Sequence, residues 1–320
     1  MIFQIHSLRS HRTRIVTCLQ LHHVLKTFIR EKNMKPFIKW VGGKTQIIGD
    51  VMDSFPPNIH NYHEVFVGGG SVLFTVLSRG IVSGKVCAYD LNGTLIAVYK
   101  NIQENTEKLH KHLDSLYSEY ESCTGSDINR KPETLEDAKK SKENYYYWIR
   151  QWFNTHRDET PERSATFIFL NKMCFRGVYR EGPNGFNVPF GHYKTTPTLI
   201  SLEELYSIRA LIKNVDFKHC DFREAFKNIE HGDFVYLDPP YAPETKTSFV
   251  GYTKDGFGLK DHQDLFELIK SSKVQFSMSN ANVKLVTDTF SEYKIKEVQA
   301  RRSINSKNPD AVTQEVIIYS

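Results

Sequence analysis

One short segment, Asp238-Pro239-Pro240-Tyr241, combines a carboxylate, two rigid residues and an aromatic ring directly after an apolar run. Proline fixes its backbone φ angle and has no N–H, so the carbonyl groups of this segment are held in place. An exocyclic aromatic amine that acts as a nucleophile requires two hydrogen-bond acceptors and a stacking surface. The Asp238 carboxylate and the Pro239 carbonyl would accept its two N–H groups, and the Tyr241 ring would stack on its base. The alternative is a turn that only ends a strand, because Asp-Pro and Pro-Pro are common in loops.

A glycine cluster, FVGGG at 66–70, follows another strand-like run and begins a helical pattern. This is the context of a nucleotide-binding turn, but Leu73 stands where the dinucleotide fingerprint requires a third glycine. Asp90 ends the next expected strand, where an acid can hydrogen-bond a ribose diol. A glycine turn and a ribose acid without the pyrophosphate fingerprint predict a nucleoside cofactor without phosphates, which S-adenosylmethionine fits. The plainer interpretation is that these glycines only form a turn.

A second glycine-containing segment, Gly42-Gly43-Lys44-Thr45, is similar to the end of a phosphate-binding loop. That loop requires another glycine six positions before the lysine, where Ile38 stands. No strand-like run leads into the segment either, so an ATPase interpretation is disfavoured.

The elements that must position these residues alternate between short strands and helices, which is typical of a parallel sheet covered by helices. Strands are expected near residues 63–67, 85–89, 233–237, 274–277, 293–298 and 314–319, and helices after 73 and 94. The alternation stops between about 117 and 201, in a charged helical stretch, an aromatic cluster and a Gly/Pro/Asn-rich segment. We therefore expect an α/β fold in which a mainly helical domain, 117–201, is inserted between catalytic parts 34–116 and 202–320.

Composition limits the class of protein. Of the 320 residues, 40% are hydrophobic and 25% are charged, which argues against disorder, and no apolar run approaches the ~20 residues that span a bilayer. Five cysteines stand far apart without metal-ligand spacing, which predicts a reducing compartment and no metal. The first 33 residues hold six of the 42 Lys and Arg and one of the 37 Asp and Glu, so the remainder is formally neutral. Nucleic-acid binding would then require a local basic face.

Residues 1–33 form a basic N-terminal extension with four histidines. Arg-rich, acid-poor segments are typical of organelle transit peptides. The alternative is that Met34 is the true start and this stretch is an upstream extension. All the expected chemistry follows Met34, and we otherwise expect a cytoplasmic protein.

Residues 171–194 interleave basic and aromatic side chains around Asn184-Gly185. Asn-Gly favours a hairpin turn, so we expect a two-stranded ribbon that enters the major groove of DNA. Arg180 is the first candidate for a bidentate contact with guanine, whereas Arg301 and Arg302 are expected to bind phosphates. Each arginine alone could equally be a solvated surface charge. The remaining expected DNA contacts are Arg176, His192, Tyr193 and Lys194.

Taken in order, these motifs resemble those of the Dam-type (alpha-group) DNA adenine-N6 methyltransferases, over residues 35–319. The segments that carry the resemblance are KPFIKWVGGK at 35–44, the glycine turn at 66–70, YDLN at 89–92, the hairpin at 171–194, DPPY at 238–241, FSMSN at 276–280 and RRSI at 301–304. The resemblance implies a Rossmann-like S-adenosylmethionine-dependent methyltransferase sheet. It also implies direct methyl transfer to N6 of an adenine flipped out of double-stranded DNA, without a metal or a covalent enzyme intermediate.

The resemblance also implies roles for individual residues. Catalysis would involve Asp238, Pro239, Pro240 and Tyr241. The cofactor site would include Trp40, Lys44, Phe66, Gly68, Gly70, Asp90, Asp221 and Asp238. Relatives that recognise GATC commonly have asparagine where Arg176 stands and arginine where His192 stands, so we expect only a short target that contains adenine. We expect a monomer, with a restriction endonuclease of the same site as a candidate partner.

Other functions remain as alternatives. Methylation of cytosine N4 is usually marked by serine in place of Asp238, and methylation of a protein glutamine by asparagine there. A DNA-binding protein without catalysis would have no reason to keep Asp238, Tyr241, Asp90 and Gly68 together. RNA stays open as a substrate, because a flipped adenine is alike in both polymers.

Overall fold

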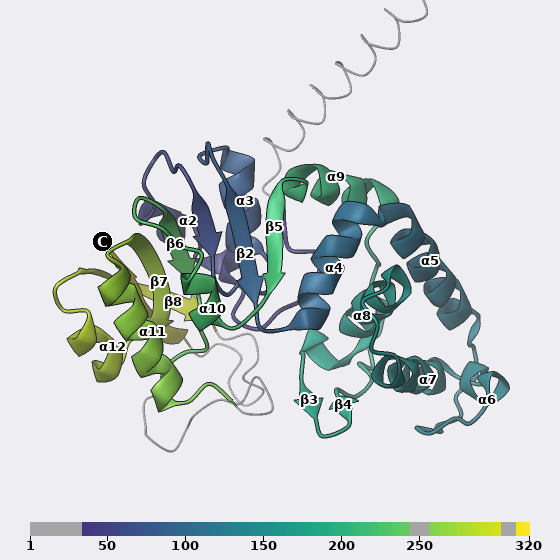
Figure 1. The fold of residues 1–320 in the computed structure, drawn as a ribbon. Helices are drawn as coiled ribbons and strands as arrows, with labels where there is room; N and C mark the ends of the chain where they lie inside the picture. The colour runs from purple at the N-terminus through teal and green to yellow at the C-terminus, as the bar shows by residue number, and fades with distance from the viewer. Residues whose placement is uncertain (1–33, 244–255, 302–311) are drawn as a thin grey trace, which may run out of the picture.

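The computed structural model describes residues 34–243, 256–301 and 312–320, so the N-terminal extension and Arg302 lie outside the described residues. A mixed sheet forms the middle layer of the fold (Figure 1). Its strands are β1 (Tyr62–Glu64), β2 (Val86–Asp90), β5 (Val215–His219), β6 (Phe234–Leu237), β7 (Gln275–Ala281), β8 (Lys294–Arg301) and β9 (Val312–Tyr319). The strand order is β5-β2-β1-β6-β7-β9-β8, with every pair from β5 to β7 parallel and β9 antiparallel to both of its neighbours.

Helices cover both faces of the sheet, because alternate residues of each strand point to opposite sides. In β2, Val86 and Ala88 join one apolar core, whereas Cys87 and Tyr89 join the other. The first core packs against α2 (Ile48–Asp53), α3 (Ser71–Arg79) and α4 (Gly93–Glu104), and the second against α10 (Phe222–Phe226), α11 (Leu259–Ser272) and α12 (Lys284–Thr289). The result is the three-layer α/β architecture expected from the sequence.

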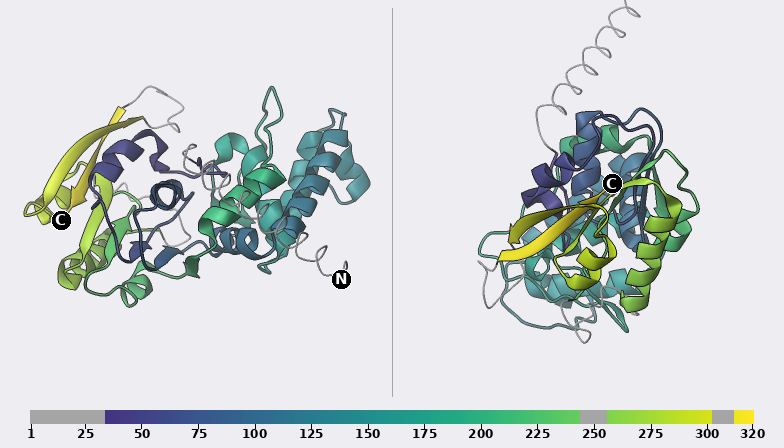
Figure 2. Two further views of the ribbon diagram at one scale, coloured as in Figure 1. Left: turned by 90° about the horizontal axis from the view of Figure 1, so that it is seen from above. Right: turned by 90° about the vertical axis from the view of Figure 1, so that its left-hand side faces the viewer.

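Helices and one small hairpin fill the insertion between β2 and β5. After α4 the chain forms α5 (Thr106–Ser122), α6 (Leu135–Lys139), α7 (Lys142–Thr155), α8 (Pro161–Met173), the 3-10 turn η2 (Phe175–Gly177), β3 (Glu181–Gly182), β4 (Gly185–Phe186) and α9 (Leu202–Ile212). These helices lie at the opposite end of the molecule from β8 and β9 (Figure 2). Residue 117 lies inside α5, and Ser201 is the N-cap of α9.

Local sequence signals define these helices. The side chains of Ser141 and Thr160 accept hydrogen bonds from backbone N–H groups in the first turns of α7 and α8. Pro161 begins α8, where the N–H that proline lacks would have no partner within the helix. Ser201 and Glu204 form a reciprocal capping box at α9. Helix α8 is buried on nearly all sides, so it forms the centre of the helical part.

Three details differ from the expectations. Strand β5 is an additional, edge strand, in which Val215 and Phe217 are buried but Asp216 is exposed, so its apolar run is short. The last two strands are antiparallel, because only residues 302–311 separate them and a parallel crossover takes a dozen residues or more. The middle of the β3–β4 turn is formed by residues 183–184 and not by Asn184-Gly185, because Gly182 pairs with Gly185. A proline at position 183 has the fixed φ angle that suits the second residue of such a turn.

Candidate active site

The segment Asp238-Pro239-Pro240-Tyr241 follows the carboxyl end of β6 and lies beside Lys44, the last residue of the motif at 35–44. Lys44 begins the 3-10 turn η1 (Lys44–Gln46), and its Nζ lies 2.7 Å from Asp238 Oδ2. Both side chains are largely buried, at 4% and 18% exposure. The same Nζ lies 5.0 Å from the centroid of the Tyr241 ring and donates a 2.6 Å hydrogen bond to the Gly42 carbonyl. Sequence-distant motifs therefore converge on one carboxylate, one ammonium and one ring, and Lys44 is not in the context of a phosphate-binding loop.

The charge on Asp238 depends on its neighbours. Burial raises the pKa of Asp238 to about 6, although the Lys44 ammonium works against this and Glu315 adds to it. Burial also raises the pKa of Glu64, at the end of β1, to about 8, although Tyr62 donates a 2.6 Å hydrogen bond to its carboxyl group. At neutral pH Glu64 is therefore mostly uncharged, and Asp238 is mostly ionised. The Lys44 ammonium therefore favours the ionised form of Asp238 against the effect of burial.

The glycine turn and Asp90, the expected ribose ligand, also meet. Asp90 Oδ2 accepts a 2.9 Å hydrogen bond from the Gly68 N–H, and its Oδ1 accepts one of 2.8 Å from the Asn92 N–H. Gly68 has φ +49, and a Cβ added there would lie 2.8 Å from Trp40 Cδ1, so no side chain fits between the turn and the indole. Gly70 likewise has φ +74 and lies against Tyr99. The turn is thus fixed between the acid and the indole.

Phe66 and Asp221 lie on the same edge of the sheet. Asp221 follows β5 and caps α10, and Arg223 Nη1 lies 3.2 Å from its Oδ1. The Phe66 ring is 6.0 Å from the Phe222 ring. Arg223 is held by Asp261 and Asp264 as well. Carboxylates, backbone N–H groups and phenyl rings suit the hydroxyls and flat base of a nucleoside, and the nearby guanidinium is already neutralised.

The DNA-reading candidates surround the small hairpin, which lies at the bottom centre of Figure 1. Arg180 Nε donates a 2.7 Å hydrogen bond to Asn187 Oδ1 across it. Arg176 has φ +58 and stacks on Phe175, whose side chain is 49% exposed. The chain 190–194 folds back on η2, where Tyr193 donates to the Cys174 carbonyl. His192 lies 3.7 Å from Glu143, and Lys194 is exposed. Of Arg301 only the backbone, at the end of β8, is described.

Asn171, at the end of α8, joins the hairpin region to the N-terminal motif. Its Oδ1 accepts a 2.9 Å hydrogen bond from the Lys39 N–H, and its Nδ2 donates to the carbonyls of Lys39 (2.8 Å) and Gly177 (3.2 Å). One residue further, the Trp40 ring stacks on the Tyr179 ring at 5.2 Å. The segment that contacts the glycine turn is therefore bound to the segment that carries the expected DNA contacts.

We expect Asn171→Ala to lower the free energy of unfolding by about 2–4 kcal/mol, because it leaves one N–H and two carbonyl groups without their partner at a side chain only 1% exposed. Urea denaturation followed by circular dichroism measures this. The matched control is Asn228→Ala, whose amide makes an exposed hydrogen bond to the Glu224 carbonyl of the preceding helix, and which should change stability by less than about 0.5 kcal/mol. Equal effects of the two substitutions would contradict the role of Asn171.

Sequence reasoning missed several residues that contact the predicted ones. Glu315, on β9, accepts a 2.7 Å hydrogen bond from the Tyr241 hydroxyl. Asn280, on β7, accepts one of 3.0 Å from the N–H of Ala242, the residue after Tyr241. The available signal was polarity inside apolar strands, where an acid or an amide needs a partner. For Asn171 no sequence signal marks the contact with Lys39.

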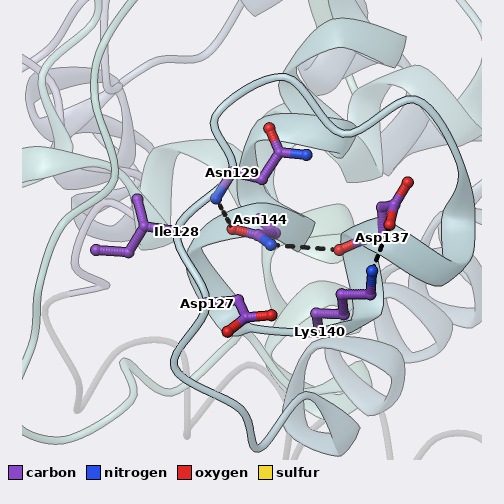
Figure 3. A pocket seen from close by; sticks show the side chains of 6 residues that line it. All are labelled: Asp127, Ile128, Asn129, Asp137, Lys140 and Asn144. Carbon is purple, nitrogen blue, oxygen red and sulfur yellow. Dashed lines mark hydrogen bonds and ion pairs between the residues drawn. The ribbon is translucent and has the colours of Figure 1, made fainter.

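A cavity of about 320 Å³ lies in the helical part, far from β6 (Figures 1 and 3). It is lined by Asp127, Ile128, Asn129, Asp137, Lys140 and Asn144. The Asn144 side chain accepts a 2.7 Å hydrogen bond from the Asn129 N–H, and Lys140 pairs with Asp137 at 2.6 Å. Its polar groups bind one another, so we do not assign the chemistry to it.

Features of two other classes of protein are not found among the described residues. Within residues 34–243, 256–301 and 312–320 there is no helix that is both long and apolar enough to cross a membrane. The same residues contain no group of three or more His, Cys, Asp or Glu side chains that could hold a metal ion.

Comparison with known proteins gives a consistent result. The family model described as D12 class N6 adenine-specific DNA methyltransferase matches residues 40–304. The chain is 37% identical to the type II methyltransferase M.MjaIII of Methanocaldococcus jannaschii, with 86% of this chain and 94% of that protein covered. It is 31% identical to the type II methyltransferase M1.LlaDCHI of Lactococcus lactis (86% and 91% covered). It is 32% identical to a DNA adenine methylase of Haemophilus influenzae (86% and 89% covered).

Proposed function

This chain belongs to the D12 class of N6 adenine-specific DNA methyltransferases, and we propose that its methyl donor is S-adenosylmethionine and that Asp238, Lys44 and Tyr241 form its catalytic site. The enzyme transfers a methyl group to adenine N6 at specific sites in DNA. The observation that carries the assignment of the site is the buried ion pair between Lys44 and Asp238, 2.7 Å long, beside the Tyr241 ring.

In this proposal the chain's own groups prepare the target amine. An adenine flipped out of the duplex stacks on Tyr241, and its N6 hydrogens bind the Asp238 carboxylate and the Pro239 carbonyl. Hydrogen bonds from N6 to both acceptors polarise its N–H bonds, which raises the electron density on N6. They also stabilise the positive charge that develops on N6 during transfer. When bound, S-adenosylmethionine would supply the methyl group from a cationic sulfur, which would leave as a neutral thioether, and N6 would then release one proton to solvent. Lys44 keeps Asp238 ionised, and Pro239 and Pro240 hold the acceptors at a fixed spacing.

The cofactor would bind along the carboxyl edge of the strands. Asp90 would accept hydrogen bonds from the ribose hydroxyls with the lone pairs that Gly68 and Asn92 do not use. Phe66 and Asp221 would contact the adenine ring of the cofactor. The remaining proposed contacts are Trp40, Lys44, Gly68, Gly70 and Asp238. Support comes from the chemistry of this edge, where two backbone N–H groups hold the Asp90 carboxylate in place and leave it lone pairs for the hydroxyls of a nucleoside without phosphates.

We further propose that residues 117–201 are the target-recognition domain, between catalytic parts 34–116 and 202–320. Arg180 would read guanine, and Arg176, His192, Tyr193 and Lys194 would make the remaining contacts of the hairpin with double-stranded DNA. Arg301 and Arg302 would bind phosphates. We propose a monomeric enzyme, and a restriction endonuclease of the same site as a partner, since two of the relatives are named type II methyltransferases.

Tritiated S-adenosylmethionine and unmethylated plasmid DNA test the proposed donor and supply the target. Label recovered as N6-methyladenine, at one short motif found by methylation-sensitive sequencing, is the expected result. Label that appears only in RNA or protein acceptors would overturn the DNA substrate. If isothermal calorimetry detects no binding of S-adenosylmethionine to the folded protein, the proposal that it is the methyl donor is overturned.

Arg180→Ala is expected to relax target choice at one guanine position by roughly ten- to a hundredfold, because a bidentate arginine contributes about 1–3 kcal/mol of discrimination. Competition between cognate and single-substituted duplexes measures this ratio. Lys194→Ala is the matched control, because Lys194 is exposed and, if it contacts DNA as a point charge at a phosphate, its loss should weaken all duplexes alike. An unchanged specificity ratio in Arg180→Ala would remove Arg180 from base recognition.

A further inference from the structure

The Tyr241 hydroxyl has a partner on the last strand of the chain. It donates a 2.7 Å hydrogen bond to Glu315 Oε2. Glu315 lies on β9 opposite Ala281 of β7, so the register of the antiparallel pair places this carboxylate at the end of the sheet where Tyr241 lies. The hydroxyl oxygen lies on the axis about which the ring rotates, so this hydrogen bond fixes the direction in which the side chain points. Because a phenolic O–H prefers to lie in the plane of its ring, the bond also favours the ring orientation that directs the O–H at Glu315.

The residue after Tyr241 is held from the neighbouring strand. Asn280 pairs with Val316 of β9 in the register, and its Oδ1 accepts hydrogen bonds from the N–H groups of Ala242 (3.0 Å) and Ala281 (2.8 Å). The Asn280 side chain is fully buried. Strands β7 and β9 therefore hold the segment at two points, one on the ring of Tyr241 and one on the backbone that follows it.

We propose that Glu315 is a positioning residue of methyl transfer, which holds the Tyr241 ring in the position and orientation in which the target base stacks on it. The proposal rests on the proposed function of Asp238 and Tyr241, and it extends the catalytic apparatus to the C-terminal strand. It gives the antiparallel insertion of β9 between β7 and β8 a role in catalysis.

Glu315 has a second, electrostatic effect that a test must separate from the first. The titratable and charged groups around Asp238 are Lys44 of η1, Glu64 of β1, Tyr236 of β6, Tyr241 and Glu315 of β9. The negative charge of Glu315 raises the pKa of Asp238, and burial and Glu315 both keep the pKa of Tyr241 far above neutrality. Removal of this charge lowers the pKa of Asp238. Loss of the hydrogen bond frees the ring.

Two substitutions separate these effects. Glu315→Gln removes the charge but keeps an oxygen that can accept from Tyr241, whereas Glu315→Ala removes both. In Glu315→Ala we expect kcat at pH 8 to fall by about 10- to 100-fold, the size of effect that follows a misplaced reacting group. In Glu315→Gln we expect kcat at pH 8 within about threefold of wild type. In both variants the acidic limb of kcat/KM should move to lower pH, because ionised Asp238 is the active form.

Tyr241→Phe completes a double-mutant cycle, because it removes the hydroxyl and keeps the ring. If Glu315 acts through that hydroxyl, Tyr241→Phe lowers kcat about as much as Glu315→Ala does, and the double variant is no slower than either. Additive losses would overturn the proposal. So would a Glu315→Gln enzyme as slow as Glu315→Ala.

The matched control is Glu297→Ala, a glutamate exposed on β8 of the same antiparallel ribbon, which should keep wild-type kcat and pH profile. All variants are compared on the wild-type target duplex, with thermal unfolding and calorimetric binding of S-adenosylmethionine as parallel measurements. Failure of the wild type to form N6-methyladenine would count against the proposed function. A Glu315→Ala enzyme with wild-type kcat beside an active wild type would count against the role of Glu315 alone.

Discussion

Replacing Asp238 by alanine is expected to lower kcat for DNA methylation by about a thousandfold or more, the effect of removing a main group that stabilises transition-state charge. The Asp238 carboxylate lies 2.7 Å from Lys44 Nζ. It also directly precedes Pro239, whose carbonyl is the second proposed acceptor. Without this carboxylate, N6 keeps one acceptor and the developing positive charge loses its counter-ion. Single-turnover methylation of the cognate duplex measures the chemical step without product release.

The alanine variant leaves Lys44 buried without its carboxylate, so part of any loss could reflect folding. Asp238→Asn keeps the shape of the side chain and one acceptor oxygen, and it should retain more activity than Asp238→Ala. Thermal unfolding and calorimetric binding of S-adenosylmethionine are the controls for both variants. A folded, cofactor-binding Asp238→Ala enzyme that methylates within about tenfold of wild type would refute catalysis by Asp238.

The sequence predicts the places of the two candidate acids in the fold, because each follows a local pattern that forms a strand. Asp90 closes the buried run of β2, and Asp238 closes that of β6. Parallel strands bring their carboxyl ends to one edge of a sheet, so the two acids had to share that edge once the fold was expected. The position of each acid could be predicted because the pattern that forms the strand also locates the residue at its end.

The partners of these acids could not be predicted in the same way. The contact of Lys44 with Asp238, and that of Tyr241 with Glu315, depend on tertiary structure that joins distant parts of the chain. Glu315 lies near Tyr241 only because β9 enters the sheet antiparallel, between β7 and β8. The pattern of polar and apolar residues in β9 does not distinguish a strand placed between β7 and β8 from one added at the edge of the sheet. Pairing of strands is a property of the whole sheet.

The small hairpin shows the opposite limit, where two local signals compete. Asn184-Gly185 favours a tight turn of its own, but residue 183 is a proline, whose φ angle suits the second position of a turn one residue earlier. The observed pairing of Gly182 with Gly185 follows the proline. A shift of one residue changes which side of the ribbon each side chain faces. The sequence alone therefore does not predict which face of the hairpin carries the hydrogen bond between Arg180 and Asn187.

Replacing Lys44 by methionine is expected to move the acidic limb of kcat/KM upward from about pH 6, the pKa of Asp238. In the proposed mechanism ionised Asp238 is the active form, so activity is present above its pKa and is lost as pH falls through it. Burial raises this pKa and the Lys44 ammonium lowers it, so removing the ammonium raises it further. At pH 6.5 we expect a loss of roughly 10- to 100-fold, which recovers in part at pH 9. Methionine keeps the length of the buried side chain.

The direction of this shift distinguishes three roles for Lys44. If Lys44 only contacted the cofactor, KM for S-adenosylmethionine would rise while the acidic limb stayed near pH 6. If it were only structural, the loss would be equal at every pH. Lys35→Met is the matched control, because Lys35 is exposed in the same segment, and it should leave the profile unchanged. Loss of Lys44 should move the limb upward and loss of Glu315 downward, because the two groups act on Asp238 with opposite sign. Parallel shifts in both variants would contradict the assignment of Asp238 as the group that titrates.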